Sequence, residues 1–276
     1  MSVLITKADG EREPFDEHKL KESLERSRAP REVIENVVKK VTASIRDGMT
    51  TEEIYKHAFS LLATGAVPVA ARYSMKRAVL ELGPSGFPFE DFVGEIFKAK
   101  GFKVQTGVVM QGLCVEHEVD LSAFNEKKEL IGEVKFHNEL GLKSDLKVAL
   151  YVQARIEDLQ AFRQKSGRRP ITEGWLITNT KFTKSAISYA ACKGIKMISW
   201  TYPKTGNLHD LIEETQVHPI TCLTTLTRHE KLALLESGIV LCKSVPDSAL
   251  KLKNVGVTGE RIDKVIEESK HLCFPI

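Results

Sequence analysis

The sequence predicts a mixed α+β protein with three domains in a row. Its 276 residues exceed one ordinary domain, and 42% apolar with 28% charged residues is typical of a globular chain. The cluster Gly83-Pro84-Ser85-Gly86 separates two differently patterned regions, and leucine-rich helical segments follow residue 218. The expected parts are a β-hairpin with helices at 1–83, an α/β sandwich at 87–217 and a small helical unit at 220–276.

The first domain is expected to open with a short hairpin. Residues 3–5 and 13–15 are strand-like, and the dipeptide Asp9-Gly10 between them favours a tight turn. Asp16 suits the N-cap of a helix, and Thr50 with Glu53 forms a capping box. The expected helices cover 16–28, 32–45, 50–63 and 67–82.

The second domain alternates strands with helices. A helix at 89–100 precedes strand-like runs at 102–109, 113–124 and 130–136. A long helix at 143–164, a buried strand at 175–178, a helix at 183–193 and a strand at 196–200 follow. This order predicts a sheet with helices packed on it.

Charge, cysteines and hydropathy exclude several classes of protein. Forty Lys plus Arg against 37 Asp plus Glu give a net charge of +3, too small to indicate nucleic-acid binding by itself. The five cysteines are widely spaced without a CxxC pair, which indicates a reducing compartment and predicts a cytoplasmic protein. No run approaches the roughly 20 apolar residues of a membrane span, and the N-terminal residues lack the apolar core of a signal peptide, so no membrane partner is expected.

Acidic residues alternate along two neighbouring strands of the second domain. If 113–124 and 130–136 pair as an antiparallel hairpin around the loop 125–128, facing residue numbers sum to 253. The facing pairs are then Asp120 with Glu133, Glu118 with Lys135, and Glu116 with His137. The apolar residues Val119, Leu121, Val134 and Phe136 fall on the opposite face.

Asp120, Glu133 and Lys135 form a set that suits phosphodiester hydrolysis. Close carboxylates hold a divalent cation, and an amine orients the attacking water or offsets charge on the phosphate. Glu133 and Lys135 share a face because only alternate strand residues do. Hard oxygen ligands predict Mg²⁺, or Mn²⁺ in its place. The alternative is a solvated face with charge pairs, but carboxylates on a partly covered face repel one another without a cation.

Residues 87–200 resemble a nuclease domain of the PD-(D/E)xK superfamily, in its Mrr-like restriction-endonuclease branch. The resemblance rests on the opening helix FEDFV at 89–93 ending in Lys100-Gly101-Phe102, the Asp120 strand, Glu133-Val134-Lys135, and the closing helix and strand pairs. It implies that Asp120 and Glu133 are metal ligands, that Lys135 is the catalytic lysine and that Glu90 is an accessory carboxylate.

Three further polar residues lie near this set. Related nucleases often place a polar residue at the position of Gln153, although a solvated helix residue beside the core stripe explains it equally well. Glu116 shares the polar face farther from the centre. His117 falls on the apolar face, which favours a hydrogen-bonded core histidine over a ligand.

Two lysines give the first domain a way to hold phosphate. Lys7 follows the first strand and Lys19 lies near the start of a helix, whose N-terminus attracts anions. Ordinary solvent-exposed lysines are the alternative. No Walker A pattern occurs, which argues against a motor ATPase.

The same region resembles an ATP-cone domain over about residues 1–82. The matching runs are VLITKADG at 3–10, Glu13, Phe15-Asp16, Lys19-Leu20, TEEI at 51–54 and VAARY at 69–73, ending in Lys76-Arg77. The resemblance implies regulatory binding of ATP or dATP without turnover, and self-association into a homo-oligomer through this domain. By similarity, the nucleotide site is lined by Lys7, Glu13, Asp16, Lys19 and Thr51.

The C-terminal unit allows two interpretations. The run NVGVTG at 254–259, followed by Glu260-Arg261-Ile262, resembles a helix-hairpin-helix that presents backbone amides to a DNA phosphate. A helical bundle with glycine C-caps is the other reading, and nearby acids at 260, 263, 267 and 268 disfavour phosphate contact.

Together these features predict a nucleotide-regulated, metal-dependent DNA endonuclease. The alternative is a regulator in which the ATP-cone senses nucleotide and switches DNA binding by a nuclease-like domain that does not cut. A purely structural oligomerisation module is a third hypothesis. The complete set of Asp120, Glu133 and Lys135 favours the enzyme.

Overall fold

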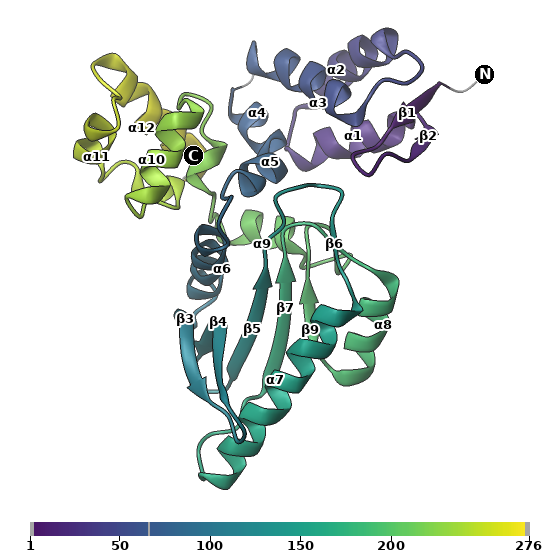
Figure 1. The fold of residues 1–276 in the computed structure, drawn as a ribbon. Coiled ribbons are helices and arrows are strands. Elements are labelled where there is room, and N and C mark those ends of the chain that lie inside the picture. The colour runs from purple at the N-terminus through teal and green to yellow at the C-terminus, as the bar shows by residue number, and fades with distance from the viewer. Residues whose placement is uncertain (1–2, 66, 274–276) are drawn as a thin grey trace. The chain divides into compact units, whose positions relative to one another are not determined.

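The expected α+β class is confirmed by the computed structural model, which describes residues 3–65 and 67–273 (Figure 1). The backbone forms two compact units. One unit combines 1–78 with 220–237 and 242–276, and the other combines 79–219 with 238–241. Each is described by itself below.

The N-terminal part of the first unit is a hairpin followed by helices. Its elements are β1 (Leu4–Thr6), β2 (Arg12–Pro14), α1 (Glu17–Arg26), α2 (Arg31–Ser44), α3 (Thr51–Ala63), α4 (Val67–Tyr73) and α5 (Met75–Leu80). Asp16 caps α1, and Thr50 with Glu53 forms the expected capping box on α3. Leu24, Val41 and Leu62 are fully buried between the helices.

The single helix expected at 67–82 is wrong, because the chain breaks at Ser74 into α4 and α5. The Ser74 hydroxyl donates to the carbonyl of Ala71 at 2.8 Å. Such local side-chain bonds compete with the helix and bend it.

The C-terminal part of the same unit is helical. Its elements are η1 (Ile220–Cys222), α10 (Arg228–Glu236), η2 (Cys242–Ser244), α11 (Ala249–Asn254) and α12 (Glu260–Cys273). The buried Glu268 carboxylate accepts hydrogen bonds from the backbone and hydroxyl groups of Thr224 and Thr225. Cys222, Cys242 and Cys273 are buried, whereas Cys114 and Cys192 of the other unit are exposed.

The second unit is a five-stranded mixed sheet with helices on both faces (Figure 1). Its strands are β3 (Lys103–Gln111), β4 (Glu116–Phe124), β5 (Glu129–Lys135), β7 (Glu173–Thr178) and β9 (Lys196–Ile198), in that spatial order. Strands β3, β4 and β5 are antiparallel neighbours, and β5, β7 and β9 run parallel. A separate two-stranded sheet joins β6 (Lys143–Ser144) to β8 (Lys181–Phe182).

Four helices cover this sheet: α6 (Phe87–Ala99), α7 (Leu146–Lys165), α8 (Lys184–Lys193) and α9 (Leu208–Thr215). Helices α6 and α9 pack together, α6 contacting β3, β4 and β5, while α7 and α8 pack together on the other face. Helix α6 approaches β3 closely at Gly94, where an added Cβ would lie 3.2 Å from Thr106. Helices α6 and α7 therefore border the acidic residues of β4 and β5 from opposite faces of the sheet.

No helix within the described ranges combines the length and the apolar character that crossing a bilayer requires.

Candidate active site

The hairpin of β4 and β5 has the expected register over one half of its length. Residues 121–124 pair with 129–132, from Leu121 opposite Gly132 to Phe124 opposite Glu129, so the facing numbers sum to 253. Beyond Leu121 the two strands diverge. The ladder ends at Leu121 opposite Gly132. The expected pairs of Asp120 with Glu133, of Glu118 with Lys135 and of Glu116 with His137 are therefore wrong.

On its other edge β5 pairs with the parallel strand β7 from Leu130 to Lys135, on both sides of the point of divergence. His137 lies beyond the end of β5, and its backbone N–H donates to the side chain of Asn179 at 2.9 Å. Beyond Gly132, β5 is therefore paired with β7 and no longer with β4.

The side chain of Asp120 lies between β4 and β5 where the two strands diverge. Its carboxylate accepts the backbone N–H of Val134 at 2.7 Å. Burial, followed by the negative charge of Glu133, raises the pKa of Asp120 to about 6, although the Val134 N–H and Arg155 oppose this shift. Asp120 therefore lies in a partly desolvated position beside a second carboxylate.

A change of face in β3 and β4 accompanies the divergence. Val119 packs with Ile131 and Leu159 under α7, whereas Leu121 pairs with Thr106 on the α6 side. The expectation that Val119 and Leu121 share a face is wrong. Gly107 lies in β3 between Thr106, the partner of Leu121, and Val108, the partner of Val119. Its φ of +59° is a backbone conformation that glycine adopts readily, and it interrupts the alternation of side chains along the strand.

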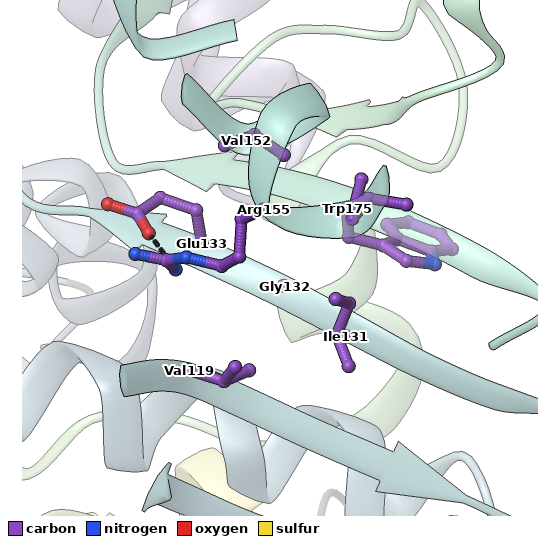
Figure 2. A pocket seen from close by; sticks show the side chains of 8 residues that line it. Val119, Ile131, Gly132, Glu133, Val152, Arg155 and Trp175 are labelled. Carbon is purple, nitrogen blue, oxygen red and sulfur yellow. Dashed lines mark hydrogen bonds and ion pairs between the residues drawn. The ribbon is translucent and has the colours of Figure 1, made fainter. Parts of the chain in front are cut away.

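Glu133 points toward α7 and forms an ion pair with Arg155 (Figure 2). The Arg155 Nη1 donates to the Glu133 carboxylate at 2.6 Å, and the two side chains are only 7% and 15% exposed. Arg155 also donates to the hydroxyl of Tyr151, whose ring lies 4.5 Å from the guanidinium. The guanidinium is thereby fixed over β5.

Glu90 reaches the same region from the other side of the sheet, on α6. Burial, followed by the negative charges of Asp120, Asp91, Glu118 and Glu133 in that order of size, raises the pKa of Glu90 to about 7. The carboxylates of Glu90, Asp120 and Glu133 thus lie close enough to influence one another.

Lys135 and Gln153 are less closely joined to this group. Lys135 is exposed, two residues after Glu133 on the same strand. Gln153 donates to Glu157 on its own helix at 2.7 Å. The amide of Gln153, which was expected near the site, is therefore hydrogen-bonded to Glu157 on its own helix.

The donor chemistry fits a divalent cation. Within residues 3–65 and 67–273, no three His, Cys, Asp or Glu side chains are arranged as a complete ligand set. Mg²⁺ does not need one, because it usually keeps several waters and binds through one or two carboxylates plus substrate phosphates. Three carboxylates beside one guanidinium leave excess negative charge, which a cation would neutralise.

Arg155 is the residue that the sequence reasoning missed. It lies on the buried stripe of α7, three residues after Val152 and four before Leu159, both of which are buried. A cation on a buried stripe requires an anionic partner, and that signal was present in the sequence. A small cavity of about 10 Å³ lies beside it, and the Arg155 Nε has no hydrogen-bond partner among the described residues.

His117 is hydrogen-bonded as expected, to Asp158 of α7 at 2.8 Å. The same carboxylate accepts the backbone N–H groups of Cys114 and Val115. These bonds, with His117 first, lower the pKa of Asp158 to about 2. This cluster fastens the tip of the β3–β4 hairpin to α7.

In the other unit, three of the five expected nucleotide residues converge. The Glu13 carboxylate lies 3.1 Å from the Lys19 ammonium and 3.9 Å from that of Lys7. Lys7 is also 2.5 Å from Glu11, a hydrogen bond that raises the pKa of Lys7. Two lysines therefore flank one carboxylate.

The remaining two lie at helix starts. Asp16 accepts the backbone N–H of His18 as the N-cap of α1. Thr51 opens α3, and its neighbour Thr50 forms a bridge to Thr6 at the end of β1, next to Lys7.

Models of three protein families match successive parts of the chain. An ATP cone domain matches residues 3–79, a restriction endonuclease domain of the Mrr type matches 83–201, and the family described as AF1548-like, C-terminal, matches 218–273. The predicted fusion of an ATP-cone with an Mrr-like domain is confirmed.

One relative and two solved structures are similar to this chain. An uncharacterized protein of Archaeoglobus fulgidus is 33% identical over 179 residues, which cover 64% of this chain and 98% of that protein. The crystal structure of a protein of unknown function, AF1548, matches with a TM-score of 0.55 and 33% identity, over 68% of this chain and 98% of the other. The MspJI restriction endonuclease, in complex with a 27-mer oligonucleotide, matches at 12% identity with a TM-score of 0.25, over 63% of this chain and 40% of that one. The chain therefore belongs to the AF1548-like family, with an ATP-cone domain joined to its restriction-endonuclease domain.

Proposed function

We propose that the protein is a nucleotide-regulated, metal-dependent DNA endonuclease. The observation that carries the proposal is the meeting of Asp120 and Glu133 where β4 and β5 diverge, in a domain that matches restriction endonucleases. Burial and the charge of Glu133 make the ionised form of Asp120 costly, and a bound cation would stabilise that form.

Each residue has a role in this proposal. Asp120 and Glu133 would hold Mg²⁺ or Mn²⁺, which supplies a Lewis acid and lowers the pKa of a bound water. Lys135 shares the strand face of Glu133 and would offset charge on the scissile phosphate. Glu90 is the accessory carboxylate, with a pKa of about 7 that allows it to hold or release a proton near neutral pH. Gln153 would contact substrate at the rim after leaving Glu157.

A cleavage assay with matched acids tests the metal site. Linear, nicked and branched DNA are incubated with the full chain, with Mg²⁺, with Mn²⁺ and with EDTA. Asp120→Asn is expected to abolish cleavage, whereas Glu116→Gln at the exposed start of β4 leaves it unchanged. Equal cleavage by both variants would contradict the assignment of Asp120 as a metal ligand.

Nucleotide regulation is proposed to act through Lys7, Lys19 and Glu13. Two ammonium groups around one carboxylate near a helix N-terminus can exchange that carboxylate for phosphates of ATP or dATP. Asp16 and Thr51 would complete the site. Titration with a fluorescent ATP analogue is expected to show binding that Lys19→Ala weakens and Lys40→Ala, on the exposed side of α2, does not. Light scattering with and without ATP tests self-association.

One observation favours a second candidate, a DNA-binding regulator that does not cut. Arg155 occupies Glu133 with a cationic group, and a guanidinium that stays there would oppose metal binding. Nucleotide-dependent DNA binding without cleavage under any metal is the result that selects this candidate.

A further inference from the structure

A second candidate site lies on the same domain, at the opposite end of β5 from Glu133. It is a groove of about 710 Å³ lined by seven residues. They come from the start of β3, the end of β4 with the following loop, and the segment before β7. Its side chains include Lys103, Lys127, Arg169 and Phe124.

The register of the sheet places cation and aromatic ring together. Lys103 of β3 is the cross-strand partner of Phe124 of β4, so both side chains project from the same face. Phe124 remains 37% exposed although it is a large apolar side chain. An exposed ring beside an ammonium group is suited to a flat, anionic ligand.

The loop that closes the groove is held in one conformation. Arg169 donates to the carbonyls of Asn125 and Glu126, at 2.8 and 3.1 Å. The Asn125 side chain accepts the backbone N–H groups of Lys127 and Lys128, both at 2.9 Å. A ligand would therefore meet an ordered loop.

The groove has a surplus of positive charge. Three cationic residues line it against one acid, Glu126. In the described part of the chain, neither Lys103 nor Lys127 forms an ion pair. The adjacent Lys128, by contrast, is bound to Glu173 at 2.6 Å. Lys103 and Lys127 are thus available to an anion from solution.

We propose that this groove binds a single-stranded segment of DNA, with a base against Phe124 and phosphates at Lys103, Lys127 and Arg169. Aromatic rings combined with cationic grooves are the usual means of holding single strands. The size favours a single strand over a duplex, because a specific protein–DNA interface buries about 1,000–2,500 Å² of protein surface, whereas seven residues around this volume suit one or two nucleotides.

The groove would act as an anchor remote from the chemistry. Phe124 is paired with Glu129, and four strand residues separate Glu129 from Glu133, about 13 Å at 3.3 Å per residue. A strand held in the groove therefore has its reacting phosphodiester elsewhere. The choice of DNA rather than another nucleic acid rests on the proposed function. The arrangement of the ring and the cationic side chains in the groove does not depend on it.

Binding of a fluorescently labelled 12-nucleotide DNA strand to the full chain in EDTA tests the groove without requiring cleavage. Phe124→Ala is expected to weaken binding at least about fivefold, the lower bound for one stacked base. Lys127→Ala should also weaken binding and lower the slope of log affinity against log salt by about 0.7. Lys193→Ala, which removes an exposed lysine from α8, is the matched control.

Glu126→Gln separates a binding role from a folding defect, because removing the only acid of the groove should tighten binding, which a damaged protein would not do. The proposal is overturned if Phe124→Ala and Lys127→Ala bind like the unmodified chain, if Lys193→Ala weakens binding equally, or if blunt duplex DNA loses as much affinity as the single strand. Cleavage of a blunt duplex is expected to stay unchanged in the groove variants. Loss of that cleavage only in Asp120→Asn supports the proposed function independently of the groove.

Discussion

Two arginine–glutamate pairs join α7 to β5, and their surroundings differ. Arg163 binds Glu129 at 2.7 Å and Arg155 binds Glu133 at 2.6 Å. Eight helical residues span about 12 Å and four strand residues about 13 Å, so one helix can form both pairs with one strand. Glu133 has Asp120 and Glu90 as acidic neighbours with raised pKa values. At Glu129 the strands are regularly paired.

The same kind of ion pair, between arginine and glutamate, therefore leaves a different net charge at the two ends of β5. At Glu129 one cation matches one anion. At Glu133 one guanidinium neighbours two carboxylates, those of Glu133 and Asp120, and Glu90 lies near them on the other side of the sheet, so negative charge remains uncompensated. Only the second end is suited to a divalent ion.

The largest expected effect separates the two glutamates. Glu133→Gln should lower the rate of DNA cleavage at least about a hundredfold, because it removes a proposed metal ligand. Glu129→Gln should preserve the rate and reduce stability by about 1–3 kcal/mol, because Arg163 loses its anion. Rates from a gel assay and unfolding in urea measure both quantities. Comparable loss of cleavage in the two variants would contradict the comparison.

The arginines provide the next contrast. Arg155→Ala should reduce stability in EDTA by roughly 3 kcal/mol, since the carboxylates of Glu133 and Asp120 are left without their cation. Added Mg²⁺ should restore much of this loss, because 100 times Kd contributes about 2.7 kcal/mol. Arg163→Ala should lose stability that Mg²⁺ does not restore. Thermal unfolding with and without Mg²⁺ decides, and equal restoration in both variants would count against the site.

The raised pKa values predict a pH dependence. Asp120, with a pKa of about 6, must lose its proton to bind a cation, so Mg²⁺ affinity should rise up to about tenfold per pH unit below pH 6. Without metal the opposite holds for stability. The folded chain keeps the protons of Asp120 and Glu90 where the unfolded chain, with carboxyl pKa values of about 4, has released them, so stability falls as pH rises from about 4 to about 7. Calorimetric Mg²⁺ titrations at pH 5.5 and 7.5 check the first trend, and a flat affinity would refute it.

The smallest expected effect concerns the backbone opposite Asp120. Gly107→Ala should cost about 1 kcal/mol, because alanine is strained at a φ of +59°, and should slow cleavage several-fold by moving Asp120. Gln105→Ala, at the regularly paired end of β3, is the control. Urea unfolding of both variants gives the difference, and identical results would show that Gly107 is not needed there.

The sequence was sufficient for most of the elements and for half of the hairpin, but the helix expected at 143–164 begins at Leu146 after β6, and β6, β8 and α9 were not predicted. Polar and apolar alternation predicted the register of 121–124 with 129–132 and brought Asp120 and Glu133 to neighbouring strands. Periodicity and capping residues predicted most helices. These features depend on residues near one another in the chain.

The remainder depends on packing between distant segments. Beyond Gly132, β5 is paired only with β7, about 40 residues later in the chain, and the change of face occurs at the backbone of Gly107. Arg155 could be located on α7, but its bond to Glu133 needs the crossing of helix and strand. No local pattern contains that crossing.

Two of the five cysteines are exposed and three are buried, so their reactivity can report when the buried ones become accessible. Iodoacetamide should modify Cys192 first, then Cys114, whose pKa is raised by the hydrogen bond of its thiol to Asp158. Cys222, Cys242 and Cys273 should react only when the helices around them separate. Mass spectrometry of the alkylated chain would therefore time the opening of the C-terminal helices without any added label.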